Sequence, residues 1–174
     1  MICKVTKGVN FMQRKIRNLV YTAMMAALVA VATLFIHIPI PMQSGYCNLG
    51  DALILSSGAL LGPWAAISAA IGSALADLLL GYAAYAPATA VIKGLMGLIA
   101  GICCARKKNA VGRALWMVAA ELIMVAGYFL FETALYGAAG AAGSLLGNGC
   151  QAVVGLLVGC GVWPLMGRIK KMIP

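Results

Sequence analysis

The sequence predicts an all-α integral membrane protein, a compact bundle of six transmembrane helices with both termini in the cytoplasm. Three observations predict this class. Of the 174 residues, 63% are hydrophobic and 10% are charged, whereas a soluble domain carries roughly 25% charged residues. Most of the chain consists of apolar stretches of about 20 residues, the length that crosses a hydrocarbon core of about 30 Å. The basic residues gather at the two ends and in the middle of the chain.

The basic residues set the expected orientation. All but one of the 13 Lys and Arg residues fall within residues 4–17, 106–113 and 168–171, and the exception is Lys93. Basic clusters favour the cytoplasmic side of a membrane, and an even number of spans places all three there. The net charge of +9 then serves binding to anionic lipid headgroups, and no nucleic-acid partner is expected. The expected segments are a basic N-terminal tail (1–16), a six-helix membrane domain (17–169) and a C-terminal tail (170–174).

Proline and the apolar runs delimit the first two helices. The first helix is expected at about residues 17–37 and ends before Pro39 and Pro41, because proline disfavours helix at the preceding residue. A second helix at about residues 49–61 spans only about 20 Å, too short to cross the membrane alone. The loop between them, residues 39–47, is therefore expected to dip into the protein, where it is shielded from lipid.

Four more helices follow. The third is expected at about residues 64–80 and ends in the turn GYAAYA. Pro87 suits the first turn of a fourth helix, which extends to about residue 104. After the basic loop ARKKNAVGR, the fifth and sixth helices are expected at about residues 114–135 and 144–166, joined by the small-residue turn YGAAGAAG.

Polar residues inside apolar spans are costly and mark functional sites. Six of them, from five helices, are expected in the outer third of the membrane: Asp51, Asp77, Lys93, Glu132, Asn148 and Gln151. Glu121 lies nearer the cytoplasm and does not join them. Tyr128 shares a helical face with Glu132, and Tyr46, Tyr82 and Tyr85 lie in outer loops. Polar groups with aromatic walls predict a small-molecule pocket, and Asn48 beside Asp51 completes the candidate substrate-binding set.

Several of these residues also have structural interpretations. Asn48 can cap the second helix while Asp51 reaches back to its backbone, a capping-box variant, and this role is favoured over ligand contact. Asp77 and Lys93 can neutralise each other, since buried charges are usually paired.

Asn148 and Gln151 can instead join helices. Glu132 has no basic partner at its depth except Lys93, which makes it the strongest candidate for ligand contact. With three acids against one lysine, the pocket favours a neutral or protonatable heteroaromatic ligand over an anionic one.

Catalysis and metal binding find no support in the sequence. The six cysteines form no CxxC, His37 is the single histidine, and neither gives metal-ligand spacing. No GxSG motif for an intramembrane serine protease occurs, and the aspartates are too isolated for a metal-dependent phosphotransferase. No enzyme, cofactor or metal is therefore expected. The alternative is a self-sufficient transporter or channel whose acids carry protons or cations, although polar residues confined to the outer third argue against a continuous path.

Three segments resemble a known family: NLGDALILSSGALLGP, GSALADLLLGYAAYAPATAVIKGLMGLIAG and TAMMAALVA. They resemble the substrate-binding S components of energy-coupling factor (ECF) vitamin transporters, in the branch assigned to riboflavin, pyridoxine or hydroxymethylpyrimidine. The resemblance implies a multi-pass protein of the bacterial cytoplasmic membrane. It would capture a vitamin from outside, with B6-type or hydroxymethylpyrimidine compounds preferred and riboflavin next.

The resemblance also implies partners. An S component has no ATPase of its own, associates with a transmembrane coupling subunit and two ATPase subunits, and topples in the membrane to release its ligand inward. The family docks its coupling subunit through an AxxxA strip on the first helix. Two series match that strip in this chain, Ala23/Ala27 and Ala26/Ala30.

Overall fold

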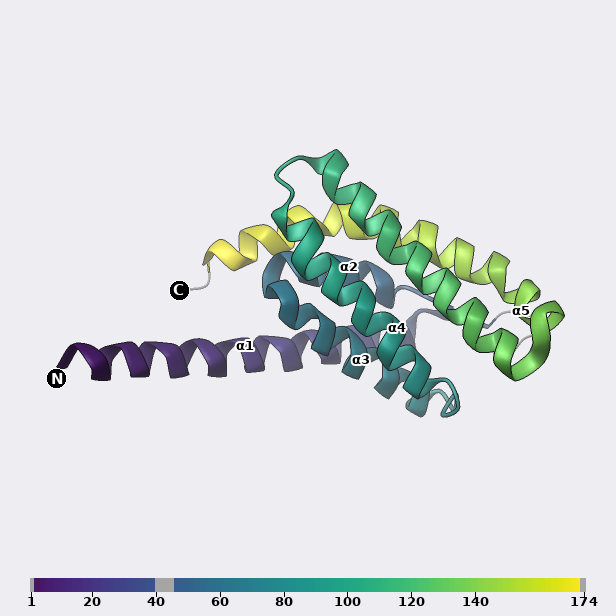
Figure 1. Cartoon of the computed structure of the whole chain (residues 1–174), viewed down its shortest axis with the longest axis horizontal. Helices are drawn as coiled ribbons and strands as arrows, with labels where there is room; N and C mark the ends of the chain where they lie inside the picture. Colours follow the sequence, from purple (N-terminus) through teal and green to yellow (C-terminus); the bar gives the residue numbers. More distant parts are fainter. Residues whose placement is uncertain (1, 40–45, 173–174) are drawn as a thin grey trace.

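The computed structural model describes the backbone of residues 2–39 and 46–172 and the side chains of residues 12–36 and 47–172. Helices make up almost all of this chain, so the predicted all-α class is confirmed (Figure 1). The first helix, α1 (Ile2–Phe35), begins well before the expected residue 17. Residues 2–16 contain one glycine and no proline, so nothing interrupts the helix there. Residues 2–16 of the expected N-terminal tail are therefore the start of α1.

A short hairpin, not predicted from the sequence, follows α1. Strands β1 (His37–Pro39) and β2 (Tyr46–Asn48) pair antiparallel, with Ile38 opposite Cys47. The pairing supplies backbone hydrogen bonds to a non-helical segment, as a protein in lipid requires. Residues 40–45 of the loop expected to dip into the protein lie outside the described residues.

Helices α2 (Gly50–Leu61) and α3 (Ala65–Leu79) follow the expected positions. Between them lies a 3-10 turn, η1 (Gly62–Trp64), in which Gly62 has a φ of 58°. At 12 residues, α2 is about 18 Å long, which agrees with the short second helix of the prediction. The left-handed backbone at Gly62 favours glycine because a side chain would be strained there.

Helix α4 (Ala86–Ile99) begins with Pro87 in its first turn, as expected, and continues as a π-helical turn, η2 (Ala100–Cys104). This turn lies directly against α2. A Cβ atom on Gly58 would overlap the backbone of Ala100, and one on Gly101 would overlap the backbone of Gly62. Glycine is therefore required for this backbone-to-backbone contact.

The remaining chain forms α5 (Ala110–Met172), a 63-residue element broken at Gly137, where φ is 77° and ψ is 166°. A straight helix of that length would measure about 95 Å, about three times the hydrocarbon core of a bilayer. At Gly137 the chain turns and comes back beside itself (Figure 1). The arms, residues 110–136 and 138–172, contain the expected fifth and sixth helices. The expected turn of several residues is reduced to this one break, because its alanines continue the helix.

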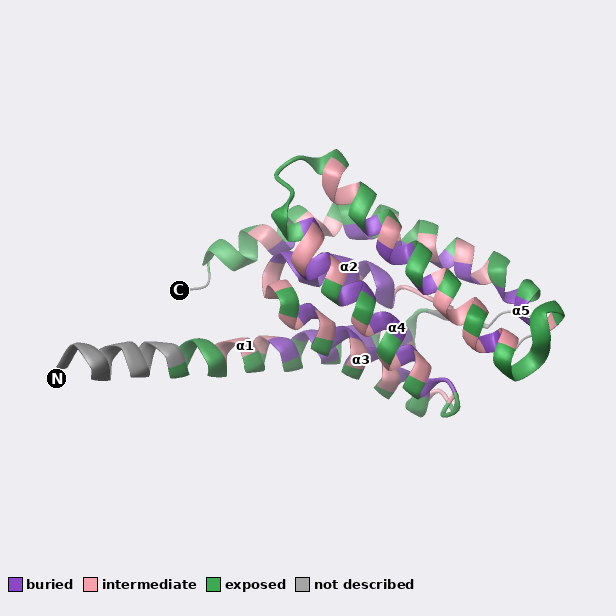
Figure 2. Cartoon of the chain, viewed as in Figure 1, coloured by how far each residue is buried: buried purple, intermediate pink, exposed green. Residues whose placement is uncertain are grey.

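The surface of the bundle suits lipid. Four stretches of the described chain are long and apolar enough to cross a membrane: Met12–Phe35, Gly50–Leu79, Ala86–Cys104 and Ala110–Met172. Leucines such as Leu146 and Leu157 are 79% and 68% exposed, and exposed residues cover the outward sides of the helices (Figure 2). The start of α1 and the end of α5 lie at the same end of the molecule (Figure 1).

Candidate functional site

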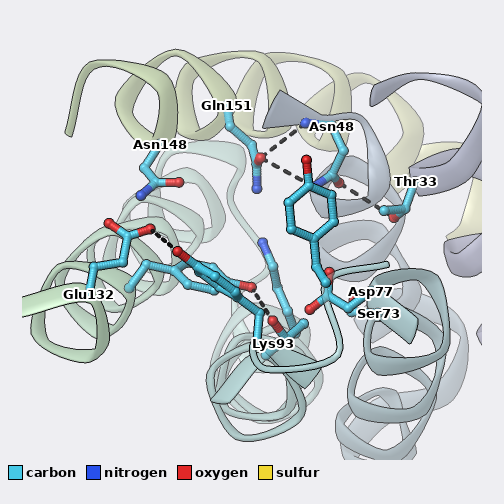
Figure 3. Close-up of a pocket in the computed structure, with 12 residues that line it drawn as sticks. Thr33, Asn48, Ser73, Asp77, Lys93, Glu132, Asn148 and Gln151 are labelled. Carbon is cyan, nitrogen blue, oxygen red and sulfur yellow. Dashed lines mark hydrogen bonds between the residues drawn. The ribbon is translucent and has the colours of Figure 1, made fainter. Parts of the chain in front are cut away.

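A cavity lies at the end of the bundle opposite the chain termini, where α1 ends, α2 begins and α5 turns. It contains about 450 Å³ of atom-free space, part of which is open to the outside. Its lining comes from the end of α1, β2, α3, the following turn, α4 and both arms of α5 (Figure 3). The lining residues are Thr33, Asn48, Ser73, Asp77, Tyr82, Tyr85, Thr89, Lys93, Tyr128, Glu132, Asn148 and Gln151.

The cavity brings together most of the candidate residues of the sequence. Asn48, Asp77, Tyr85, Lys93, Tyr128, Glu132, Asn148 and Gln151 all line it. Asp51 is fully buried behind the lining. The side chain of Tyr46 lies outside the described residues. The polar groups thus meet around one space although they come from helices far apart in the sequence.

The capping-box interpretation of Asp51 is wrong. Asn48 does bond the start of α2, since its Oδ1 accepts a hydrogen bond from the backbone N–H of Gly50 at 2.8 Å. Asp51, however, does not reach back to that backbone. Its Oδ1 lies 2.5 Å from Nζ of Lys93 in a buried ion pair, and its Oδ2 accepts a hydrogen bond from Nε2 of Gln151 at 2.6 Å. A buried ammonium group requires a counter-ion, and α2 supplies it.

Asp77 was one of two alternatives that the sequence offered for Lys93, the other being ligand contact, whereas the structure shows the ion pair of Lys93 with Asp51. α4 packs against α2 as well as α3, and spacing along the chain cannot show which neighbour is nearer. Nζ of Lys93 also lies 5.4 Å from the centroid of the Tyr128 ring, close enough for a cation–π interaction.

Gln151 connects the hairpin to this ion pair. Its Oε1 accepts hydrogen bonds from the backbone N–H of Asn48 at 3.0 Å and from Nδ2 of Asn48 at 3.2 Å. Its Nε2 donates to Asp51. Gln151 therefore joins β2, α2 and the second arm of α5, which agrees with the structural interpretation of this residue.

The strand residue beside Asn48 is Cys47, a half-buried free thiol. Burial raises the pKa of this thiol, and the negative charge of Asp51 raises it further. The group therefore stays protonated at neutral pH, unlike a nucleophilic cysteine.

Glu132 lies on the other side of the cavity and is 5% exposed. Its Oε1 accepts a hydrogen bond from Oη of Tyr85 at 3.4 Å, and its Oε2 accepts one from Oγ of Ser144 on the second arm. The ring of Tyr85 meets Phe131 edge to face, with 5.3 Å between the ring centroids. These contacts fix the carboxylate and the tyrosine at the edge of the cavity.

Three lining residues with small hydroxyl side chains were missed: Thr33, Ser73 and Thr89. Thr89 and Tyr128 share a hydrogen bond of 2.9 Å. Ser73 and Thr89 each precede a candidate residue by four positions, which places them on the same helical face, one turn away. That spacing from Asp77 and Lys93 is the signal that could have found them.

Asn148 presents an unused hydrogen-bond donor to the cavity. Asn148 is buried, with 7% of its surface exposed, and its Nδ2 has no hydrogen-bond partner among the described residues. Buried polar groups in proteins almost always have a partner. The amide group therefore points to a ligand that offers an acceptor.

The two alanine series on α1 face different surroundings. Ala26 and Ala30 are buried, at 6% and 8% exposure, whereas Ala23 and Ala27 are exposed. A Cβ atom on Gly72 of α3 would lie 2.5 Å from the carbonyl oxygen of Ala26, so this series already packs against α3. Ala23 and Ala27 form an exposed small-residue strip on α1.

Three comparisons with known proteins complete the description. Residues 13–171 match the family model for the S component of ECF-type riboflavin transporters. A protein of Pyrococcus woesei, described only as an uncharacterised protein of a gap 3′ region, is 38% identical over 135 residues, 77% of this chain and 90% of that protein. The crystal structure of the S component for biotin of an ECF-type ABC transporter superposes with a TM-score of 0.64 at 19% identity, covering 91% of this chain and 93% of that one.

Proposed function

Because this chain belongs to the family of ECF-type riboflavin transporter S components, we propose that its cavity captures a small neutral or protonatable heteroaromatic vitamin from outside the cell. The chain is thus a vitamin-binding membrane component of a transporter and not an enzyme. The superposition on the biotin S component shows that the two chains share a fold.

The unused donor of Asn148 is the observation that carries the ligand proposal. An acceptor on a heteroaromatic ring, a ring nitrogen or a carbonyl oxygen, would complete the hydrogen bonding of this buried amide. Tyr82, Tyr85 and Tyr128 supply aromatic walls, and Glu132 can accept from a hydroxyl or amino group of the ligand. These features are typical of small-molecule sites.

The size of the cavity orders the candidate vitamins. The 450 Å³ of atom-free space includes open solvent, so the enclosed space that a ligand can use is much smaller than this figure. A single-ring compound of the B6 or hydroxymethylpyrimidine type therefore comes first. Riboflavin, the substrate named for the matching family, comes next because its three fused rings and ribityl chain need more room.

The proposal includes the orientation in a bacterial cytoplasmic membrane. α1, α2, α3, α4 and the two arms of α5 would form six spans, with both termini and the basic loop before α5 on the cytoplasmic side. The positions of the chain ends at one end of the bundle and the clustering of basic residues support this arrangement. The cavity then opens outward, so release inward requires the component to reorient, as by toppling.

The exposed strip of Ala23 and Ala27 is the proposed docking surface for a transmembrane coupling subunit, which in turn binds two ATPase subunits. Small exposed residues let another helix approach closely in lipid. The buried series, Ala26 and Ala30, is occupied by packing against α3.

Two experiments test the proposed function. Calorimetric titration of the purified protein with pyridoxine, hydroxymethylpyrimidine and riboflavin should show tight, one-to-one binding of at least one compound. Vesicles containing the chain alone should then bind but not accumulate that compound, whereas vesicles that also contain the coupling and ATPase subunits should import it with ATP. Accumulation by the chain alone would contradict the proposal and favour a self-sufficient transporter.

A further inference from the structure

Lys93 lines the cavity, but the residue that neutralises its charge, Asp51, lies behind the lining. The side chain of Lys93 is 3% exposed, and its Nζ lies 2.5 Å from Oδ1 of Asp51, a residue with no exposed surface. Figure 3 shows the ammonium end of Lys93 directed toward Gln151 in the centre of the lining. The positive group thus lies at the cavity while its counter-ion stays hidden beneath it.

This arrangement opposes an anionic ligand. A carboxylate or phosphate group could bind Lys93 only by competing with Asp51 for the ammonium group. Asp51 would then keep Gln151 as its hydrogen-bond donor but lose its counter-ion, and a buried charge without compensation is strongly unfavourable. Asp77 and Glu132 line the same cavity and would repel the anion as well.

We propose that Asp51 is a specificity-determining residue that holds the ammonium group of Lys93 and thereby excludes vitamin forms carrying a carboxylate or phosphate group. This inference rests on the proposed function and adds a substrate class to it: the free alcohol or amine form of the vitamin is accepted, and the oxidised acid or the phosphate ester is rejected. Asp51 acts through Lys93 and does not touch the ligand.

Matched ligand pairs test the inference. The pairs are pyridoxine with 4-pyridoxic acid, and riboflavin with flavin mononucleotide, each titrated into the purified protein by calorimetry. The wild-type chain should prefer the uncharged member by at least about 100-fold, a free-energy difference of about 2.7 kcal/mol. Asp51→Asn, which keeps the shape of the side chain, should narrow this preference at least tenfold, mainly through tighter binding of the anion.

A double variant is the matched control. In Asp51→Asn/Lys93→Met no ammonium group remains, so the gain in anion binding should disappear. The same variant has no unpaired charge at this site and tests the inference even if Asp51→Asn alone does not fold. Because Lys93 offers nothing to an anion in the wild-type protein, the double variant and the wild type should bind the anion equally weakly, within about threefold.

Three results would overturn the inference. The first is an unchanged preference for the uncharged vitamin in folded Asp51→Asn. The second is tighter anion binding that persists in the double variant, and the third is a marked loss of anion affinity in the double variant relative to the wild type. Failure of the wild-type protein to bind either uncharged vitamin is a separate result, because it would remove the proposed function and this inference with it.

Discussion

Two buried glutamates on the first arm of α5, about three turns apart, have opposite surroundings. Glu132 lines the cavity and accepts hydrogen bonds from Tyr85 and Ser144. Glu121 is 3% exposed, lies outside the cavity lining, and neither of its carboxyl oxygens has a hydrogen-bond partner among the described residues. The same residue type on the same helix thus has two different surroundings. Burial of an acid does not by itself identify a binding site.

The two ends differ in what holds the helices together. Around the cavity, polar side chains from separate elements bond one another. Toward the chain termini, glycines let backbones touch: Gly101 lies against Gly62, and Gly58 lies against Ala100. The cavity end is therefore held by polar contacts and the other end by close packing. Substitutions at the cavity end should therefore change ligand affinity, and substitutions at the packed end should change stability.

The largest effect should come from the packed end. Gly101→Ala places a Cβ atom on the backbone of Gly62, and overpacking of this kind costs about 1–3 kcal/mol. Gly161→Ala is the matched control, because nothing lies within 4 Å of a Cβ atom there and alanine favours the helix by up to about 1 kcal/mol. Thermal unfolding in detergent should show a clear loss for the first variant only. Equal stability would contradict the glycine contact.

A substitution on the exposed strip of α1 should impair assembly with the coupling subunit without changing ligand binding. Ala27→Trp adds a large side chain to an exposed position of α1 and should abolish copurification with the coupling subunit while leaving vitamin affinity within about twofold. Leu146→Trp, on an exposed position of α5, is the control and should copurify normally. Normal copurification of Ala27→Trp would move the docking surface to another face.

The two glutamates provide the direct comparison of affinities. Glu132→Gln removes a charge and cannot accept from both Tyr85 and Ser144, and hydrogen bonds to charged groups contribute about 1.5–3 kcal/mol. Vitamin affinity should fall at least about tenfold while the protein stays folded. Glu121→Gln removes no hydrogen bond and should leave affinity within about twofold. Calorimetric titration that shows unchanged affinity in Glu132→Gln would remove this residue from the site.

The smallest effect is expected at the hydroxyl pair of Thr89 and Tyr128, which share a hydrogen bond of 2.9 Å at the cavity wall. Losing one neutral hydrogen bond costs about 1 kcal/mol, so Thr89→Val should weaken vitamin binding about threefold to fivefold. Tyr128→Phe should do the same. The double variant should lose little more than either single variant, because the interaction is shared. Fully additive losses would show that each hydroxyl contacts the ligand independently.

Apolar runs and prolines were enough to predict the positions of the helices from α2 to α4, since each run is bounded by a residue that ends or starts a helix. The gathering of Asp77, Lys93 and Glu132 followed from their shared depth in successive helices. The partner of Lys93 did not follow, because it depends on how closely α4 packs against α2. The β1–β2 hairpin was also not predicted, because strands of three residues are too short to show the alternating apolar and polar pattern of a β-strand.

Thr33 was missed for another reason, since no candidate residue follows it by four positions. A threonine is compatible with any membrane helix, because its hydroxyl group can bond the preceding turn of its own backbone. Only the three-dimensional arrangement separates Thr33 at the cavity from Thr133, whose hydroxyl donates to the carbonyl of Phe129. The helical break at Gly137 likewise needed coordinates, because neighbouring glycines such as Gly140 continue the helix.

Native mass spectrometry of the protein purified from cells that make the vitamin tests the central claim most directly. One small heteroaromatic compound should be carried per chain by the wild type and by Glu121→Gln, and its occupancy should fall sharply in Glu132→Gln. Absence of any bound compound from the folded wild type, or equal occupancy in both glutamate variants, would contradict the assignment of the cavity as the vitamin site.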